Sequence, residues 1–127
     1  MTDPSGPATP SEVAALATRQ LAAYNDADLD AFVACYAPDV VVFDGDEEVI
    51  RGIADFRARY AEMFAGGGFG ATVDARVECG EHLVEREAYW RVVDPDIGER
   101  QQGELLVRYT ARQGSLAVVQ FLRRDVG

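Results

Sequence analysis

Apolar side chains recur at intervals of three and four residues in three stretches of the first half of the chain, a spacing that places them on one face of a helix. The first stretch is preceded by Thr9, Pro10 and Glu12. These residues predict, in turn, an N-cap, a first helical residue and the closing acid of a capping box. The face of this helix consists of Val13, Leu16, Ala17, Gln20, Leu21 and Tyr24.

Two further helices are expected before the middle of the chain. Asp28 is placed to cap the second, and Pro38 is expected to stop it. The third follows Gly52 and is expected to end at the glycines of residues 66–68. The apolar faces consist of Leu29, Phe32, Val33 and Tyr36 in the second helix and of Ile53, Phe56, Tyr60 and Phe64 in the third.

The remaining patterned stretches predict strands. Short strands at residues 40–43 and 48–51 flank the turn Asp44-Gly45-Asp46. Three helices followed by hairpin-linked strands indicate an α+β fold, with the helices packed on one face of a curved antiparallel sheet. We expect one domain over residues 10–125, preceded by a loose tail over residues 1–9. The four long strands are expected at residues 71–79, 82–93, 103–111 and 116–123.

Composition narrows the possible partners. The chain has 127 residues, of which 48% are hydrophobic, and its 12 basic and 22 acidic residues leave a net charge of −10. Such a charge repels phosphate backbones, so we expect no nucleic-acid partner. All the basic residues are arginine, which excludes a lysine Schiff base.

No apolar run approaches the roughly 18 residues of a membrane helix, and residues 1–10 lack the features of a signal peptide. We therefore expect no membrane partner and a cytoplasmic location.

Residues typical of cofactor sites are scarce. His82 is the only histidine, and Cys35 and Cys79 lack C-x-x-C spacing, so the sequence favours no zinc site. No G-x-G-x-x-G motif follows an expected strand, which argues against a nicotinamide cofactor. Acidic residues crowd the turn at residues 44–48, but without the ligand spacing of a calcium loop. We therefore expect neither a metal nor another cofactor.

Two segments resemble a known superfamily. Residues 21–32 (LAAYNDADLDAF) and residues 36–40 (YAPDV) are similar to the first helix pair and the first-strand entry of the nuclear transport factor 2-like superfamily, which includes ketosteroid isomerase-like and SnoaL-like proteins. The resemblance implies a cone-shaped, cystatin-like α+β barrel whose curved sheet encloses a hydrophobic cavity beneath three helices on its concave face. It also implies a homodimer. The fold hosts isomerases, dehydratases, epoxide hydrolases, polyketide cyclases and noncatalytic domains, so it does not define one chemistry.

The resemblance also suggests catalytic positions. The general-base aspartate of ketosteroid isomerases falls on Asp44, which follows the first short strand. Their tyrosine donor on the first helix falls on Gln20, and their protonated aspartate donor falls on Val107. One of these three roles therefore keeps its residue type.

Asp44 and Gln20 each have two interpretations. Asp44 continues the alternation of Val40 and Val42 and so can point to the same face; if that face lines the cavity, burial would raise the pKa of Asp44 and suit it to proton abstraction. It also fits an ordinary hairpin turn. Gln20 is the polar residue of an apolar helical face, which predicts either a hydrogen-bonded structural amide or a donor to a ligand.

The other candidate ligand-binding residues are those expected on the cavity side, where ordinary core packing is the alternative for each apolar one. In the strand at residues 82–93 neither face is cleanly apolar, because Glu85 and Glu87 alternate with residues of mixed character. Cross-strand ion pairs with Arg108 or Glu104 are the expected use of its charges. The candidates are Tyr24, Val42, Phe56, Val107, Tyr109, Val119 and Phe121.

Two functions follow from these candidates. The first is an isomerase, lyase or hydrolase that acts on a small apolar, oxygen-bearing substrate, with Asp44 as acid/base and Gln20 as donor. The second is a noncatalytic ligand-binding or dimerisation module in which Asp44 is structural. A homodimer is expected through the outer face of the sheet, because an exposed apolar patch commonly marks an interface. The residues expected on that face are Leu106, Leu116, Val118 and Leu122.

Overall fold

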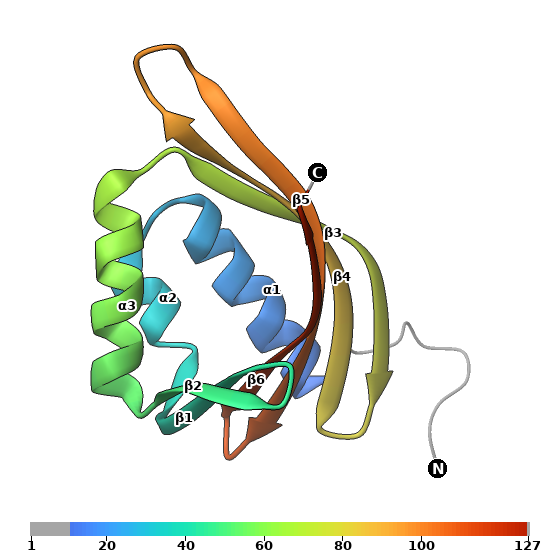
Figure 1. Cartoon of the computed structure of the whole chain (residues 1–127). Helices are drawn as coiled ribbons and strands as arrows, with labels where there is room; N and C mark the ends of the chain where they lie inside the picture. The colour runs from blue at the N-terminus through green and yellow to red at the C-terminus, as the bar shows by residue number, and fades with distance from the viewer. Residues whose placement is uncertain (1–10, 127) are drawn as a thin grey trace.

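Three helices lie inside the curve of one large sheet (Figure 1). The computed structural model describes residues 11–126, so the expected tail at residues 1–9 lies outside the described residues. The helices are α1 (Glu12–Asn25), α2 (Leu29–Val33) and α3 (Ile53–Gly66). The strands are β1 (Tyr36–Asp44), β2 (Glu47–Arg51), β3 (Phe69–Cys79), β4 (His82–Asp94), β5 (Glu99–Arg112) and β6 (Ser115–Val126).

The six strands form a single sheet in the order β2-β1-β6-β5-β4-β3. The expected α+β class, with helices on the concave face of a curved sheet, is confirmed (Figure 1). Two details differ from the expectation. The neighbouring strands β1 and β6 pair in parallel, so the sheet is mixed. β2 and β3 also remain at opposite ends of the strand order, so the sheet does not close into a barrel.

The start of α1 differs from the predicted capping box. Ser11, and not Thr9, is the N-cap, and its side-chain oxygen accepts a hydrogen bond from the Ala14 N–H at 3.2 Å. Glu12 is therefore the first helical residue, where its negative charge interacts favourably with the positive end of the helix dipole. Thr9 and Pro10 lie outside the described residues.

The second helix is shorter than predicted. Asp28 caps it as expected, accepting from the Ala31 N–H at 3.1 Å, but α2 ends at Val33 and Tyr36 already begins β1. Pro38 therefore lies within a strand. The register between β1 and β6 shifts between Tyr36 and Val41, and this irregular stretch tolerates a proline because it has no ladder hydrogen bond to lose there.

The core fills the space between the helices and the sheet. Its centre is an aromatic cluster in which the Phe32 and Phe56 rings stack with centroids 5.7 Å apart. Asn25, at the end of α1, exchanges two hydrogen bonds with the backbone of Ala71 on β3, at 2.8 and 2.9 Å. These contacts anchor the helix layer to the sheet on the far side of the core from β1.

One of the residues that we predicted on the outer face of the sheet lies on the inner face instead. Leu116 is fully buried in the core rather than exposed on the outer face. The pairing of β5 with β6 shifts register between Thr110 and Ala111, which lets both Leu116 and Val119 face inward although they are three residues apart. Of the other expected interface residues, Leu106 and Val118 are half-buried and Leu122 is exposed. The homodimer stays a prediction.

Candidate functional site

A cavity of about 120 Å³ lies between the helices and the inner face of β4, β5 and β6. One side is apolar, with Leu21, Met63 and Leu105 among its residues. The other side carries tyrosine hydroxyls, one amide and one carboxyl group. The full lining is Gln20, Leu21, Tyr24, Phe32, Tyr36, Tyr60, Met63, Ala71, Glu87, Tyr89, Arg91, Leu105, Tyr109, Val119 and Phe121.

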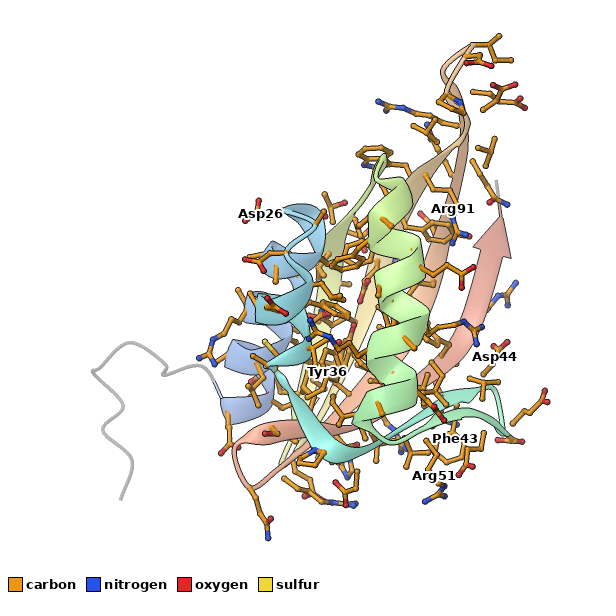
Figure 2. The ribbon with its side chains drawn as sticks, turned by 90° about the vertical axis from the view of Figure 1, so that its left-hand side faces the viewer. Asp26, Tyr36, Phe43, Asp44, Arg51 and Arg91 are labelled. Atoms are coloured by element: carbon orange, nitrogen blue, oxygen red, sulfur yellow. The ribbon has the colours of Figure 1, made fainter. Side chains whose placement is uncertain are left out.

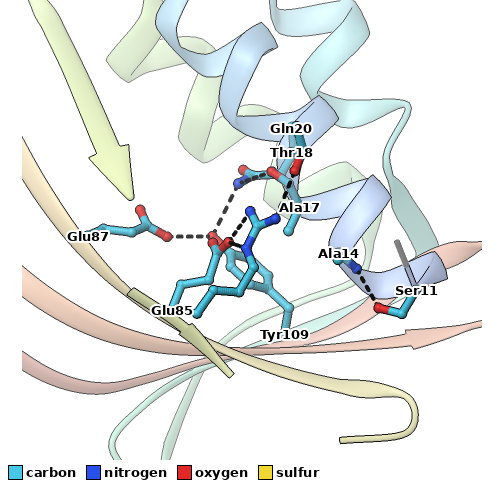
Figure 3. A network of polar contacts seen from close by, with 9 residues as sticks. Ser11, Ala14, Ala17, Thr18, Gln20, Glu85, Glu87 and Tyr109 are labelled. Atoms are coloured by element: carbon cyan, nitrogen blue, oxygen red, sulfur yellow. Dashed lines mark hydrogen bonds and ion pairs between the residues drawn. The ribbon is translucent and has the colours of Figure 1, made fainter. Parts of the chain in front are cut away.

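A chain of hydrogen bonds runs along the polar wall. The Tyr36 hydroxyl donates to Gln20 Oε1 at 2.9 Å, and Gln20 Nε2 donates to the Tyr109 hydroxyl oxygen at 3.3 Å. The Tyr109 hydroxyl in turn donates to Glu87 Oε2 at 3.2 Å (Figure 3). Gln20 Nε2 also donates to the Ala17 carbonyl at 3.1 Å, and this hydrogen bond fixes the orientation of the Gln20 side-chain amide. The network therefore joins α1, β1, β5 and β4 and ends on a carboxylate.

A second carboxylate lies two residues before Glu87 on the same face of β4. Glu85 has an exposed fraction of 0% and forms an ion pair with Arg76 of β3, whose Nε donates to Glu85 Oε2 at 2.7 Å (Figure 3). Arg76 also donates to the Thr18 hydroxyl at 3.1 Å. The other oxygen, Glu85 Oε1, is buried and meets no hydrogen-bond donor among the described residues. Arg76 thus holds Glu85 as the charged neighbour of Glu87.

These surroundings shift several pKa values. Burial, and next the charge of Glu85, raise the pKa of Glu87 from its ordinary value to about 7, although the hydrogen bond from Tyr109 opposes the rise. Burial also raises the pKa of Glu85, against the influence of Arg76. The pKa values of Tyr36 and Tyr109 lie well above the usual range, chiefly because both hydroxyls are buried. Near neutral pH the wall therefore holds neutral phenols and a carboxyl group that readily exchanges its proton.

A wider groove of about 410 Å³ adjoins the cavity on the side of α3 and β2. Tyr60, Met63, Arg91 and Phe121 line both spaces. The Arg91 guanidinium carbon lies 5.7 Å from the centroid of the Tyr89 ring, which places the cation over an aromatic residue of the cavity wall. Figure 2 shows Arg91 beside α3, at a distance from the labelled Asp44. The cavity and the groove thus share four lining residues, of which Arg91 is the cation at their junction.

Comparison with known proteins identifies the family. The model of the SnoaL-like domain matches residues 17–127, which is most of the chain. The chain belongs to the SnoaL-like domain family. No curated protein sequence matches it.

Solved structures support the same fold for this SnoaL-like domain. It is similar to RV0760c from Mycobacterium tuberculosis, with 14% identity, a TM-score of 0.82 and coverage of 95% of this chain and 100% of that one. An uncharacterized cystatin-fold protein from Novosphingobium aromaticivorans has 22% identity, a TM-score of 0.77 and coverage of 89% and 98%. An LEH-like epoxide hydrolase from M. tuberculosis has 17% identity, a TM-score of 0.74 and coverage of 87% and 80%. At these identities the similarity shows the fold alone.

The residues proposed from the sequence separate into three groups in the SnoaL-like domain. Gln20, Tyr24, Tyr109, Val119 and Phe121 line the cavity. Val42 lines the adjoining groove, while Phe56 and Val107 are buried in the core and line neither space. Gln20 of α1 therefore meets Tyr109, Val119 and Phe121 of the last two strands at one site.

Asp44 lies elsewhere. It is the last residue of β1, its side chain is exposed, and it lines neither the cavity nor the groove (Figure 2). Asp44 does not share the buried environment of Val40 and Val42, because β1 ends at Asp44 and the chain there enters the β1–β2 turn. Its catalytic role stays a prediction without support from the geometry.

Glu87, Tyr36 and Arg91 are cavity residues that sequence analysis did not select. The β4 charges form their described ion pairs with β3, Glu85 with Arg76 and Arg86 with Asp74, whereas the expected partner Glu104 acts on Arg86 only as a nearby opposite charge. A usable signal was present in the strand register. Leu83, Glu85 and Glu87 lie directly opposite Tyr109, Val107 and Leu105, and directly opposed residues share a face of the sheet. The face assigned to β5 therefore also determines the face of β4.

The described residues contain no group of three histidine, cysteine or acidic side chains that could hold a metal ion. Within residues 11–126, no helix is long and apolar enough to cross a membrane. The available chemistry is that of Glu87 and the tyrosine hydroxyls beside an apolar wall. Such an arrangement can accept or donate one proton and can donate hydrogen bonds to a ligand oxygen.

Proposed function

We propose that this SnoaL-like domain is a cofactor-independent acid–base enzyme for a small, mostly apolar substrate that carries an oxygen function, with Glu87 as the general acid/base. The observation that supports the proposal is the position of Glu87 in the cavity wall, 7% exposed, with a pKa of about 7 and a hydrogen bond from Tyr109. An acid/base works best when its pKa lies near the working pH. Proton transfer of this kind is common to isomerases, lyases and hydrolases.

The hydrogen-bond chain suggests how the charge would be balanced. The ionised Glu87 removes a proton from a carbon next to the substrate carbonyl, and the electron pair of that C–H bond moves onto the carbonyl oxygen. Once Glu87 is protonated, the Tyr109 hydroxyl no longer has an anionic acceptor and can donate to the new oxyanion. Gln20 and Tyr36 hold the Tyr109 hydroxyl oxygen in place. Return of the proton to another atom would complete an isomerisation.

A noncatalytic ligand-binding role is the second candidate. This role is favoured because the side chains of Tyr36, Gln20 and Tyr109 already have hydrogen-bond partners within the protein. The cavity is also close to the size that holds one small ring, since a dry cavity of about 150 Å³ binds benzene. Both functions use the same binding site, and a measurement of proton exchange on a bound ligand distinguishes them.

Cyclohexanone is a suitable probe because it combines one ring with one carbonyl oxygen and has exchangeable protons beside the carbonyl. The experiment follows the replacement of these protons by deuterium in heavy water, by NMR, with the wild-type protein, Glu87→Gln and Glu78→Gln. Glu78 is exposed on β3 and lines no part of the cavity. The Glu78→Gln variant therefore removes the same charge without altering the site.

We expect the wild-type protein and Glu78→Gln to accelerate exchange, and we expect Glu87→Gln to reduce that acceleration by about a hundredfold or more, which is the lower end of the range for a general base. Equal exchange by Glu87→Gln would overturn the role of Glu87. Saturable binding of cyclohexanone without exchange by the wild-type protein would support the noncatalytic candidate instead.

A further inference from the structure

Arg91 is the cation at the junction of the cavity and the outer groove. It lies on β4, is exposed, and lines both spaces. Among the described residues it forms no ion pair. Its guanidinium carbon lies 5.7 Å from the centroid of the Tyr89 ring. The guanidinium group therefore keeps its hydrogen-bond donors available at the mouth of the site.

The local charge of the groove is opposite to that of the chain. The chain carries a net charge of −10, which repels anions from most of its surface. The charged residues that line the groove are Arg59 and Glu62 of α3 together with Arg91, and neither Arg59 nor Glu62 forms an ion pair with another described residue. Two cations and one anion leave a single positive charge there, which suits one anionic group.

The two ends of the site lie on one strand. Glu87 and Arg91 are four residues apart on β4 and both line the cavity. Residues four apart on a strand lie on the same face, about 13 Å apart at the usual rise per residue. The wall between these positions includes Tyr89 and, from other elements, Met63 and Phe121. A single ligand can therefore present an oxygen function to Glu87, an apolar body to the wall and its other end to Arg91.

We propose that the ligand of this site is a monoanionic amphipath, in which an oxygen-bearing ring enters the cavity near Glu87 and a carboxylate at the other end pairs with Arg91. This inference rests on the proposed function, since it specifies the class of substrate for the same cavity. Guanidinium groups pair with carboxylates through two parallel hydrogen bonds. A dianion is disfavoured, because the groove offers one net positive charge in a strongly acidic chain.

A matched pair of probes tests the charge alone. The first is the pentanoate that carries a para-hydroxyphenyl group on its terminal carbon, and the second is its uncharged primary amide. Binding of both is measured by calorimetry to the wild-type protein, to Arg91→Gln and to Arg19→Gln, at low and high salt. Arg19 is exposed on α1 and lines neither space, so its variant controls for the loss of one positive charge.

We expect the wild-type protein and Arg19→Gln to bind the carboxylate about fivefold more tightly than the amide, as a partly exposed ion pair allows. Arg91→Gln should bind both probes alike, and added salt should reduce the wild-type preference. Equal binding of the two probes by the wild-type protein, or a preference that survives in Arg91→Gln, would overturn the inference. So would the failure of both probes to bind.

The proposed acid–base function is judged separately, because cyclohexanone has no anionic group and its exchange does not require Arg91. Accelerated exchange together with no preference for the carboxylate would overturn the ligand class and leave Glu87 as the acid/base. Preference for the carboxylate without exchange would support the ligand class and remove the catalytic role.

Discussion

Two acidic regions of this chain have opposite environments. The β1–β2 turn holds Asp44, Asp46, Glu47 and Glu48, all of which are exposed. The inner face of β4 holds Glu85 and Glu87, which are both buried against the helices. In the turn, a hydrogen bond from Arg51 lowers the pKa of Glu48, whereas on β4 burial raises the pKa of Glu87. The comparison shows that the number of carboxylates in a segment says little about their chemistry until solvent access is known.

The largest expected difference between the two regions is in the pH dependence of stability. The pKa of Glu87 rises from 4.5 to about 7 in the folded protein, so between these pH values the folded state binds more protons than the unfolded state. The free energy of unfolding should therefore fall as pH rises through this range, by roughly 3 kcal/mol at most, and then stop falling. Glu87→Gln should remove most of this fall.

Urea denaturation across this pH range measures the effect, with Glu78→Gln as the control for lost surface charge. Glu85 adds to the fall in the wild-type protein, because burial raises its pKa as well. A pH profile of Glu87→Gln that is parallel to that of the wild-type protein would mean that Glu87 is solvated like the residues of the turn.

The ion pairs of the two regions should differ next most. Arg76→Met leaves Glu85 buried without its cation, which we expect to cost about 2 kcal/mol above neutral pH, less than for a fully buried pair because the Arg76 side chain is partly solvated. The cost should shrink at acidic pH, where Glu85 takes up a proton. The matched variant Arg51→Met breaks the exposed pair with Glu48 and should leave stability unchanged. Thermal unfolding of both variants at two pH values tests this, and equal effects would contradict the burial argument.

A smaller effect is expected from the hydrogen bond between Tyr109 and Glu87. Tyr109→Phe removes the donor to Glu87 Oε2 and should cost about 1 kcal/mol of unfolding free energy. It should also raise the pKa of Glu87 further above about 7, because this bond favours the ionised form. An NMR titration of carbon-labelled glutamate carboxyls measures the change. Tyr89→Phe, which alters a cavity residue without such a bond, should leave the pKa of Glu87 in place.

The smallest effect is expected at the turn itself. Asp44→Asn changes an exposed residue that lines no cavity, and asparagine suits turns nearly as well as aspartate. Stability and cyclohexanone exchange should both match those of the wild-type protein, as is usual for surface substitutions. Loss of exchange in Asp44→Asn with full exchange in Glu87→Gln would reverse the comparison and restore Asp44 as the acid/base.

Much of the fold could be predicted because its signals are local. The apolar spacing on α3, the cap at Asp28 and the glycines after α3 each act within a few residues, and each is present in the structure as expected. Gly67, for example, ends the helix with a φ of 61°, a conformation that glycine adopts without strain. Two boundaries differed: Ser11 caps α1 in place of Thr9, and Tyr36 begins β1 instead of continuing the second helix.

The site was predictable to the extent that strand faces could be separated. Tyr109, Val119 and Phe121 were assigned to the cavity because their strands alternate clearly, and Gln20 because it interrupts an apolar helical face. Glu87 was not, because the charges on both faces of β4 obscure its alternation. Its face follows from pairing with β5, which is a relation between strands and not a property of either one.

The sequence by itself therefore determined the α+β class and most of the apolar faces, since periodicity and turn residues act over short distances along the chain, and the resemblance of residues 21–32 and 36–40 indicated the family. Only the tertiary structure decided which carboxylate is the functional candidate. Asp44 and Glu87 are both acidic residues on strands, but β1 ends in solvent at Asp44, while β4 carries Glu87 beneath α1 and beside Tyr109. Desolvation depends on what covers a side chain, and here that cover comes from residues distant in the sequence.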